Sequence, residues 1–71
     1  MLTISEQIRL LARRAGLSIS ALAAATGQTP QNLNNKLRRD NFTVKELQAI
    51  ATAAGVTVNI IWTGKDGKPL L

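Results

Sequence analysis

Four side-chain amides stand within five consecutive positions of this chain, at Gln31, Asn32, Asn34 and Asn35. A side-chain amide carries both a hydrogen-bond donor and an acceptor, so it can pair with the major-groove edge of adenine, as a guanidinium pairs with guanine. A polar helix face is often merely solvated, but Lys, Glu or Ala would serve that purpose better than asparagine, a weak helix former. The cluster therefore indicates a surface that reads bases.

The element that carries these amides is predicted as a helix over residues 30–39. Thr29 is a suitable N-cap, and Pro30 suits the first helical position because the N–H that it lacks would have no partner there. Leu33 and Leu37 lie four residues apart and define the buried side. The outermost row is then Gln31, Asn35 and Arg39, at about 140°, 180° and 140° from the leucines, with Asn32 and Arg38 on the shoulders.

The charge balance of the chain favours a polyanionic partner. Nine basic residues face four acidic ones, which gives a net charge of +5 over 71 residues. Nucleic acid is such a partner, and phosphates attract positive charge without regard to sequence. We expect contacts to the DNA backbone from the cations near the helix end and from polar residues at helix starts and turns, namely Ser18, Thr29, Lys36, Arg38, Asn41 and Lys45.

The composition argues against an enzyme. The chain has no cysteine and no histidine, and its four acidic residues are scattered. Common metal sites and nucleophile–base pairs therefore cannot be assembled, so we expect no catalytic residue, no metal and no cofactor. No small-molecule site is evident. The uncharged stretches 15–35 and 47–64 contain glycine and several polar residues, so neither is a continuous apolar span and a cytoplasmic protein is expected.

Three further helices complete the predicted domain, which takes in residues 1–71. A capping box of Thr3 and Glu6 opens a helix over 4–15, and Ser18 caps a second helix over 19–26. A second capping box, of Thr43 and Glu46, opens a helix over 44–54. Apolar residues recur at three- and four-residue spacing in the first and last of these helices, and Phe42 is expected to insert into the core.

The segment 56–63 is predicted as a strand, because its β-branched and aromatic residues alternate. A turn at 64–67 and a short return strand at 68–71 would follow. The competing interpretation is a fifth helix over 57–63. A free strand edge invites pairing with a second chain, so we expect a homodimer with Val58, Ile60 and Trp62 at the interface. The alternative for Trp62 is that it covers the chain's own core.

The motif Gly16-Leu-Ser, Leu22-Ala, Gly27, Thr29-Pro-Gln-Asn-Leu33 and Leu37, followed by Leu47-Gln-Ala-Ile-Ala51 and Ala54-Gly-Val56, resembles a known family. It is similar to the Cro/C1-type (XRE-like) helix-turn-helix family of phage repressors and bacterial regulators. The similarity covers roughly residues 4–63. The spacing of the apolar residues, the helix caps, the turn glycine and the flanking helices all match the pattern of this family, which makes the motif fairly specific.

The resemblance implies a mainly α, four-helix, lambda-repressor-like domain, here with a C-terminal β-strand or short hairpin. It also implies an operator-binding dimer in which the helix from Pro30 enters the major groove. Positions matching Pro30, Gln31 and Asn35 commonly face bases in this family, and those around Ile19, Asn41 and Lys45 lie near the backbone. Two departures stand out: Pro30 has no side-chain donor, and Ile19 replaces a residue that is often polar.

The expected function is therefore that of a sequence-specific double-stranded DNA-binding regulator of transcription, acting on a palindromic operator. The predicted base contacts are Gln31, Asn32, Asn34, Asn35 and Arg39. The alternative is a protein-interaction module, such as an adaptor or antitoxin, whose C-terminal strand completes a partner's sheet. Single-stranded RNA is a weaker candidate, because it requires exposed aromatic residues and both Phe42 and Trp62 are expected to be buried.

Overall fold

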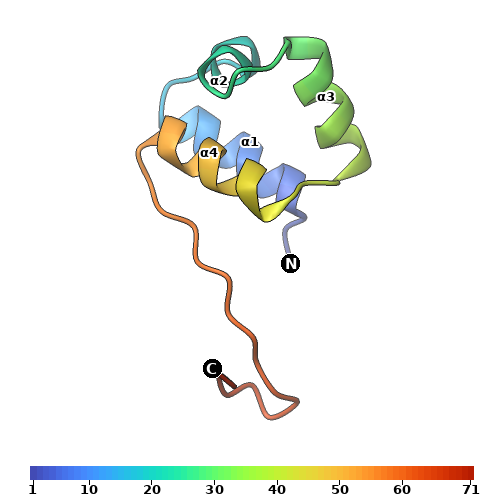
Figure 1. Cartoon of the computed structure of the whole chain (residues 1–71), viewed down its shortest axis with the longest axis vertical. Coiled ribbons are helices and arrows are strands. Elements are labelled where there is room, and N and C mark those ends of the chain that lie inside the picture. The colour runs from blue at the N-terminus through green and yellow to red at the C-terminus, as the bar shows by residue number, and fades with distance from the viewer.

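The computed structural model describes all residues from Met1 to Leu71 and contains four helices and no strand. The helices are α1 (Ile4–Arg14), α2 (Ile19–Ala25), α3 (Pro30–Arg39) and α4 (Val44–Ala54), as Figure 1 shows. The predicted mainly α architecture with four helices is confirmed. Helices α1 and α2 each end one residue earlier than predicted, because Ala15 and Thr26 serve as their C-caps.

Each helix begins at a side chain that accepts a hydrogen bond from the first turn. Thr3 and Thr43 form complete capping boxes with Glu6 and Glu46, with donor–acceptor distances of 2.9–3.1 Å. Ser18 and Thr29 accept from the main-chain N–H groups three residues further on, at 3.0 and 3.1 Å. Such caps satisfy N–H groups that a helix leaves without partners, and so they set where each helix begins.

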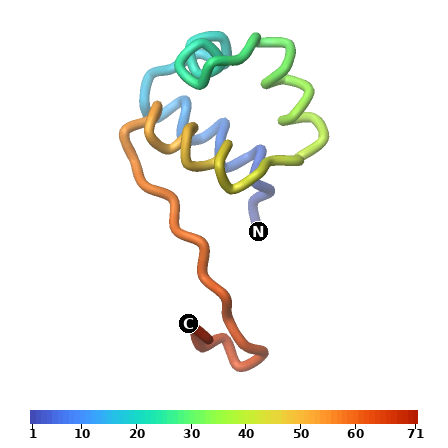
Figure 2. Tube along the Cα trace, viewed as in Figure 1, coloured from blue at the N-terminus to red at the C-terminus, as the bar shows by residue number.

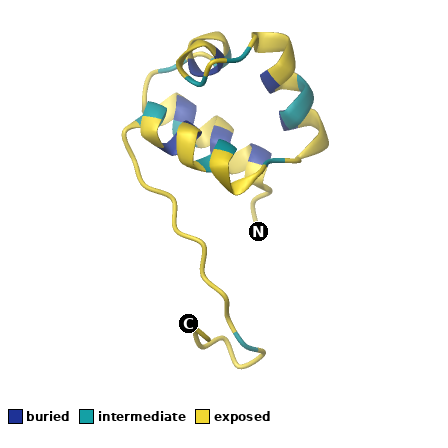
Figure 3. Cartoon of the chain, in the orientation of Figure 1, coloured by how far each residue is buried: buried dark blue, intermediate teal, exposed yellow.

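The core lies where the four helices meet, and α2 packs against each of the other three. Leu22 of α2 and Leu33 of α3 are fully buried. Phe42 is half-buried and packs against this core, as predicted. The remaining buried members of the core are Ile8, Ala12, Ala23, Leu37 and Ile50. Figure 3 shows that the buried residues are distributed over the four helices.

Residues 56–63 correct the prediction, since they form neither a strand nor a fifth helix. This segment runs away from the bundle as an extended chain (Figures 1 and 2). Residues 56–71, here called the C-terminal arm, are exposed throughout except for the half-buried Gly64. A strand is stabilised by hydrogen bonds to a neighbour and by packing of one face, and residues 56–61 have no main-chain hydrogen bond to a neighbouring strand and are exposed.

The predicted turn at 64–67 does form, and the chain reverses there. Thr63 and Pro69 make an isolated antiparallel bridge, and the N–H of Leu70 donates to the carbonyl of Trp62 at 2.8 Å. The Trp62 side chain is 67% exposed, so it does not cover the core and the expectation that it is buried was wrong. None of the four helices has the length and apolar character needed to cross a membrane.

Candidate nucleic-acid interface

Helix α3 turns its amides outward because two leucines hold its other side in the core. Leu33 is 0% exposed and Leu37 is 3% exposed. Among the predicted base-contact residues, Gln31, Asn32, Asn34 and Arg39 are exposed. Asn35 differs from the prediction: it was placed at the outermost point of the helix, yet it is half-buried. A helical wheel leaves out contacts between side chains, and here the Arg38 side chain is hydrogen-bonded to Asn35.

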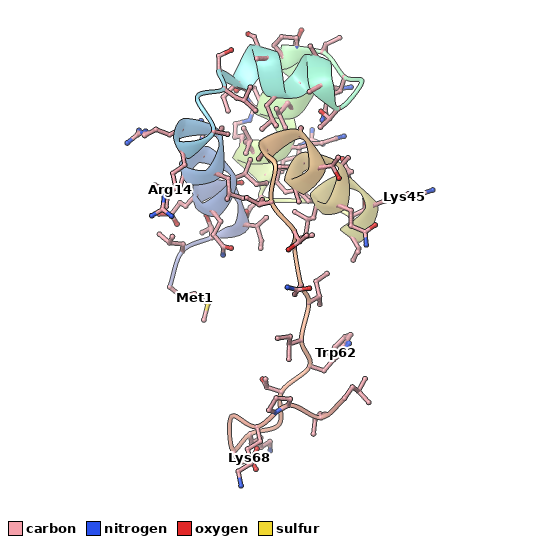
Figure 4. All side chains as sticks on the ribbon, turned by 90° about the vertical axis from the view of Figure 1, so that its left-hand side faces the viewer. Met1, Arg14, Lys45, Trp62 and Lys68 are labelled. Atoms are coloured by element: carbon pink, nitrogen blue, oxygen red, sulfur yellow. The ribbon has the colours of Figure 1, made fainter.

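The start of α4 forms a polar hollow with α3. No hydrophobic residue lines this hollow, and its lining residues are Asn32, Asn35, Lys36, Arg39, Asn41, Thr43 and Glu46. It brings together three predicted base contacts and two predicted backbone contacts. Gln31, Asn34, Arg38 and Lys45 lie outside it, as do the helix caps Ser18 and Thr29. Figure 4 shows Lys45 reaching into solvent, on the side opposite Arg14 in that view.

Lys36, predicted as a phosphate contact, is engaged within the chain. Its ammonium forms an ion pair with the Glu46 carboxylate and donates to Gln28 Oε1 at 3.2 Å. Gln28 in turn donates to Thr26 Oγ1 at 2.8 Å. The hydrogen bond from Lys36, followed by that from the Thr43 main chain, lowers the pKa of Glu46 below its usual value. Lys36 thus links the α2–α3 turn to the start of α4, and its charge is largely neutralised.

Arg38 and Asn35, predicted as separate phosphate and base contacts, are joined by a hydrogen bond. The Arg38 Nη2 group donates to Asn35 Oδ1 at 2.8 Å. The two residues lie one helical turn apart, so this contact is of the local kind that helices allow. In this contact the amide oxygen of Asn35 faces Arg38.

Ser5 holds the other end of α3, a role that its sequence context did not indicate. Its Oγ donates to the carbonyl of Leu37 at 2.6 Å, and its main-chain N–H donates to Asp40 Oδ1 at 2.7 Å. Ser5 is buried, and Asp40 adopts a left-handed conformation with φ 53° that ends α3. These bonds fasten the last turn of α3 to the first turn of α1, and so they set the direction in which α3 presents its outer face.

The sequence indicates Glu46 only as a helix cap and Asp40 only as a turn residue, and it carries no signal for Ser5 or Gln28. Ser5 and Asp40 lie 35 residues apart, and Gln28 lies in the turn before α3, so no helical periodicity connects these residues with their partners. No group of acidic residues in the structure is arranged to hold a metal ion.

The chain is similar in sequence to a known repressor protein. The chain is 35% identical over 69 residues to "Repressor protein CI" of Enterobacteria phage phi80. The chain is related to a phage CI repressor. The aligned residues cover 97% of this chain and 29% of the CI repressor, so the chain spans less than a third of the length of its relative. No family model and no solved structure matches the chain. The kinship with CI confirms the resemblance to Cro/C1-type helix-turn-helix proteins.

Proposed function

We propose that this chain is a sequence-specific double-stranded DNA-binding regulator that inserts α3 into the major groove. The orientation of α3 carries the proposal: burial of Leu33 and Leu37 leaves a face of amides and guanidinium groups directed away from the core. An α-helix fits the major groove, and Asn, Gln and Arg side chains match the donor–acceptor patterns of base edges there.

The base contacts proposed for α3 fall into two groups. Gln31, Asn32 and Asn34 occupy its exposed N-terminal half, the part of a recognition helix that most often meets bases. Asn35 and Arg39 line the polar hollow nearer its C-terminal end. Together these five residues would read successive base pairs as the helix lies along the groove.

The proposed phosphate contacts surround this face. Arg38, Asn41 and Lys45 are exposed and supply charge or donors near the end of α3 and the start of α4. The hydroxyls of Ser18 and Thr29 accept from main-chain N–H groups as helix caps, which leaves their hydrogens available to a phosphate oxygen. Lys36 contributes mainly by positioning α3, because its charge is shared with Glu46.

We also propose that two copies act together through the C-terminal arm, with Val58, Ile60 and Trp62 at their interface. These side chains are 37%, 53% and 67% exposed, and such a row of apolar groups is stabilised when a second surface covers it. An apolar groove begins at the base of the arm and includes Ile8, Leu11, Leu47, Ile50 and Val58. A two-fold dimer would present two α3 helices to half-sites about 34 Å apart, on a palindromic operator.

The relative's name, a repressor protein, supports repression by occupancy of an operator as the mode of action. We propose that such binding takes place in the cytoplasm of a bacterial host, without a cofactor and without catalysis. Regulation would then follow the concentration of the chain.

Selection of bound duplexes from a random DNA library tests the proposed function. We expect enrichment of a site with two-fold symmetry, whose affinity falls steeply with salt because bound phosphates release counterions. Failure to enrich any duplex at low salt would refute DNA reading by this chain.

The C-terminal arm also favours a second candidate, a protein-interaction module. Its side chains at Ile60, Ile61 and Trp62 are exposed beyond the bundle, where a partner protein's sheet edge would meet them. Tight binding of such a protein, without salt-sensitive affinity for duplex DNA, would select this candidate over the first.

A further inference from the structure

We propose that Asn35 and Arg38 act as a single unit that selects guanine, while the amides at the N-terminal end of α3 select adenine. This inference rests on the proposed function and concerns which base each part of α3 reads. It reassigns Arg38 from a phosphate contact to a base contact that Arg38 makes together with Asn35. Its basis is the hydrogen bond from Arg38 Nη2 to Asn35 Oδ1, at 2.8 Å.

The orientation of the Asn35 amide follows from the chemistry of its partner. A guanidinium has only donors, so the atom that faces Arg38 must be the amide oxygen. Asn35 is half-buried and lines the polar hollow with the donor-only residues Lys36 and Arg39 and with the acceptor-bearing residues Asn32, Asn41, Thr43 and Glu46. The side-chain hydrogen bond of Asn35 within the chain is the one that Oδ1 accepts from Arg38, and Nδ2 makes none. The Nδ2 group is therefore the part of Asn35 that remains for DNA.

The bases differ in how well they match such a unit. An amide recognises adenine by donating to N7 and accepting from the N6 amino group, and the second contact requires an amide oxygen that is directed at the base. In Asn35 the amino group of adenine would have to share that oxygen with a guanidinium. Guanine presents two acceptors, N7 and O6, and so pairs with the Nδ2 hydrogens of Asn35 and the unused N–H groups of Arg38. Thymine offers one acceptor there, and cytosine offers only a donor.

The N-terminal amides of α3 lack this constraint. No hydrogen bond engages the side chains of Gln31, Asn32 or Asn34, so each retains both a donor and an acceptor for adenine. The half-site is therefore expected to carry adenine toward the Gln31 end of α3 and guanine toward the Asn35 end.

The experiment is duplex selection with the full chain and three variants, Asn35→Ala, Arg38→Ala and Arg39→Ala. Asn35→Ala identifies the base pair that Asn35 reads, since preference there relaxes. We expect that position to carry guanine in the wild-type site, with a preference of about 5- to 150-fold over adenine. Arg38→Ala frees the amide oxygen and should shift the preferred base there to adenine. Arg39→Ala removes an equal charge from the same helix end and should lower affinity while leaving guanine preferred.

Three outcomes would overturn the inference: adenine at the position sensitive to Asn35→Ala, an unchanged preference in Arg38→Ala, or no position sensitive to Asn35→Ala at all. Helical circular dichroism of each variant establishes that the fold is retained, as expected for substitutions on the outer face of α3. Failure of the proposed function is a separate outcome, in which the wild-type chain enriches no duplex at all.

Discussion

The main-chain N–H of Ser5 donates to the Asp40 carboxylate across 2.7 Å, and so the first turn of α1 is capped by the residue that ends α3. The Ser5 hydroxyl reinforces this contact by donating to Leu37. The carboxylate accepts an N–H that α1 cannot satisfy itself, and a negative charge is favourable at the N-terminus of a helix. The two helices that contribute to this contact are therefore held at one relative angle.

The Asp40→Ala variant should lose about 1–2 kcal/mol of unfolding free energy, because the N–H of Ser5 loses its partner and Ala is strained in a left-handed conformation. Urea denaturation monitored by circular dichroism measures this loss. Asp40→Asn retains an acceptor oxygen and tolerates the same conformation, so it should lose less than about 1 kcal/mol. Equal losses in the two variants would show that the Ser5 contact does not stabilise the fold.

The ion pair between Lys36 and Glu46 should make stability depend on pH in the acid range. The pKa of Glu46 lies below its usual 4.5 in the folded chain, chiefly because of the hydrogen bond from Lys36. The unfolded chain therefore takes up this proton first, so the stabilisation is present above about pH 4.5 and is lost as the pH falls through the lower folded value.

The Glu46→Gln variant isolates this effect, because glutamine can still cap Thr43 but has no charge. Urea midpoints measured between pH 7 and pH 2 should show wild type more stable than Glu46→Gln at neutral pH, with the gap closing in acid. A gap that stays constant with pH would mean that the ion pair contributes nothing to stability.

Two of the three cations in the last turn of α3, Lys36 and Arg39, should differ in their effect on DNA binding. Arg39→Ala should reduce the slope of log affinity against log salt by about one for each copy of the chain bound, because an exposed charge no longer meets a phosphate or base. Lys36→Ala should change this slope less, since Glu46 already neutralises Lys36, and should instead lower thermal stability. Titrations by fluorescence anisotropy at several salt concentrations provide the slopes, and identical slopes for both variants would contradict the assignment.

Gln31→Ala should weaken operator binding by about 1–3 kcal/mol and relax preference at one base pair of each half-site. The side chain is exposed and alanine is a better helix former, so folding should be unaffected. Competition between operator variants measures the preference. An unchanged preference would show that α3 meets the groove in a different register from the one proposed.

Substituting Ile60 and Trp62 together by serine should separate association from folding. The arm lies outside the bundle, so the unfolding free energy of the monomer should stay within about 0.5 kcal/mol of wild type. Analytical ultracentrifugation should show the mass falling from that of two chains to that of one. Leu10→Gln, which replaces an exposed apolar residue of α1, is the matched control and should leave the dimer intact. A double variant that still dimerises would exclude the arm as the interface.

The sequence determined the helices of this protein because their signals are local. Capping residues at Thr3, Ser18, Thr29 and Thr43 act on N–H groups three residues away, and apolar spacing gives each helix its buried side. The burial of Leu33 and Leu37, and with it the outward direction of the amides, follows from that spacing. The same kind of local signal led to the wrong prediction of a strand over residues 56–63. β-branched residues favour a strand only where a second strand or another surface packs against it.

Only the tertiary structure decided how the ends of α3 are held and which of its polar groups remain available. Lys36 forms an ion pair with Glu46, and the N–H of Ser5 donates to Asp40, because of the angles at which the helices pack. No short-range sequence pattern encodes those angles. The polar hollow likewise exists only because the start of α4 lies beside α3. Hydrogen bonds between residues a few positions apart can be predicted from the sequence. Contacts between side chains that are distant in sequence form only when packing of the core brings their helices together.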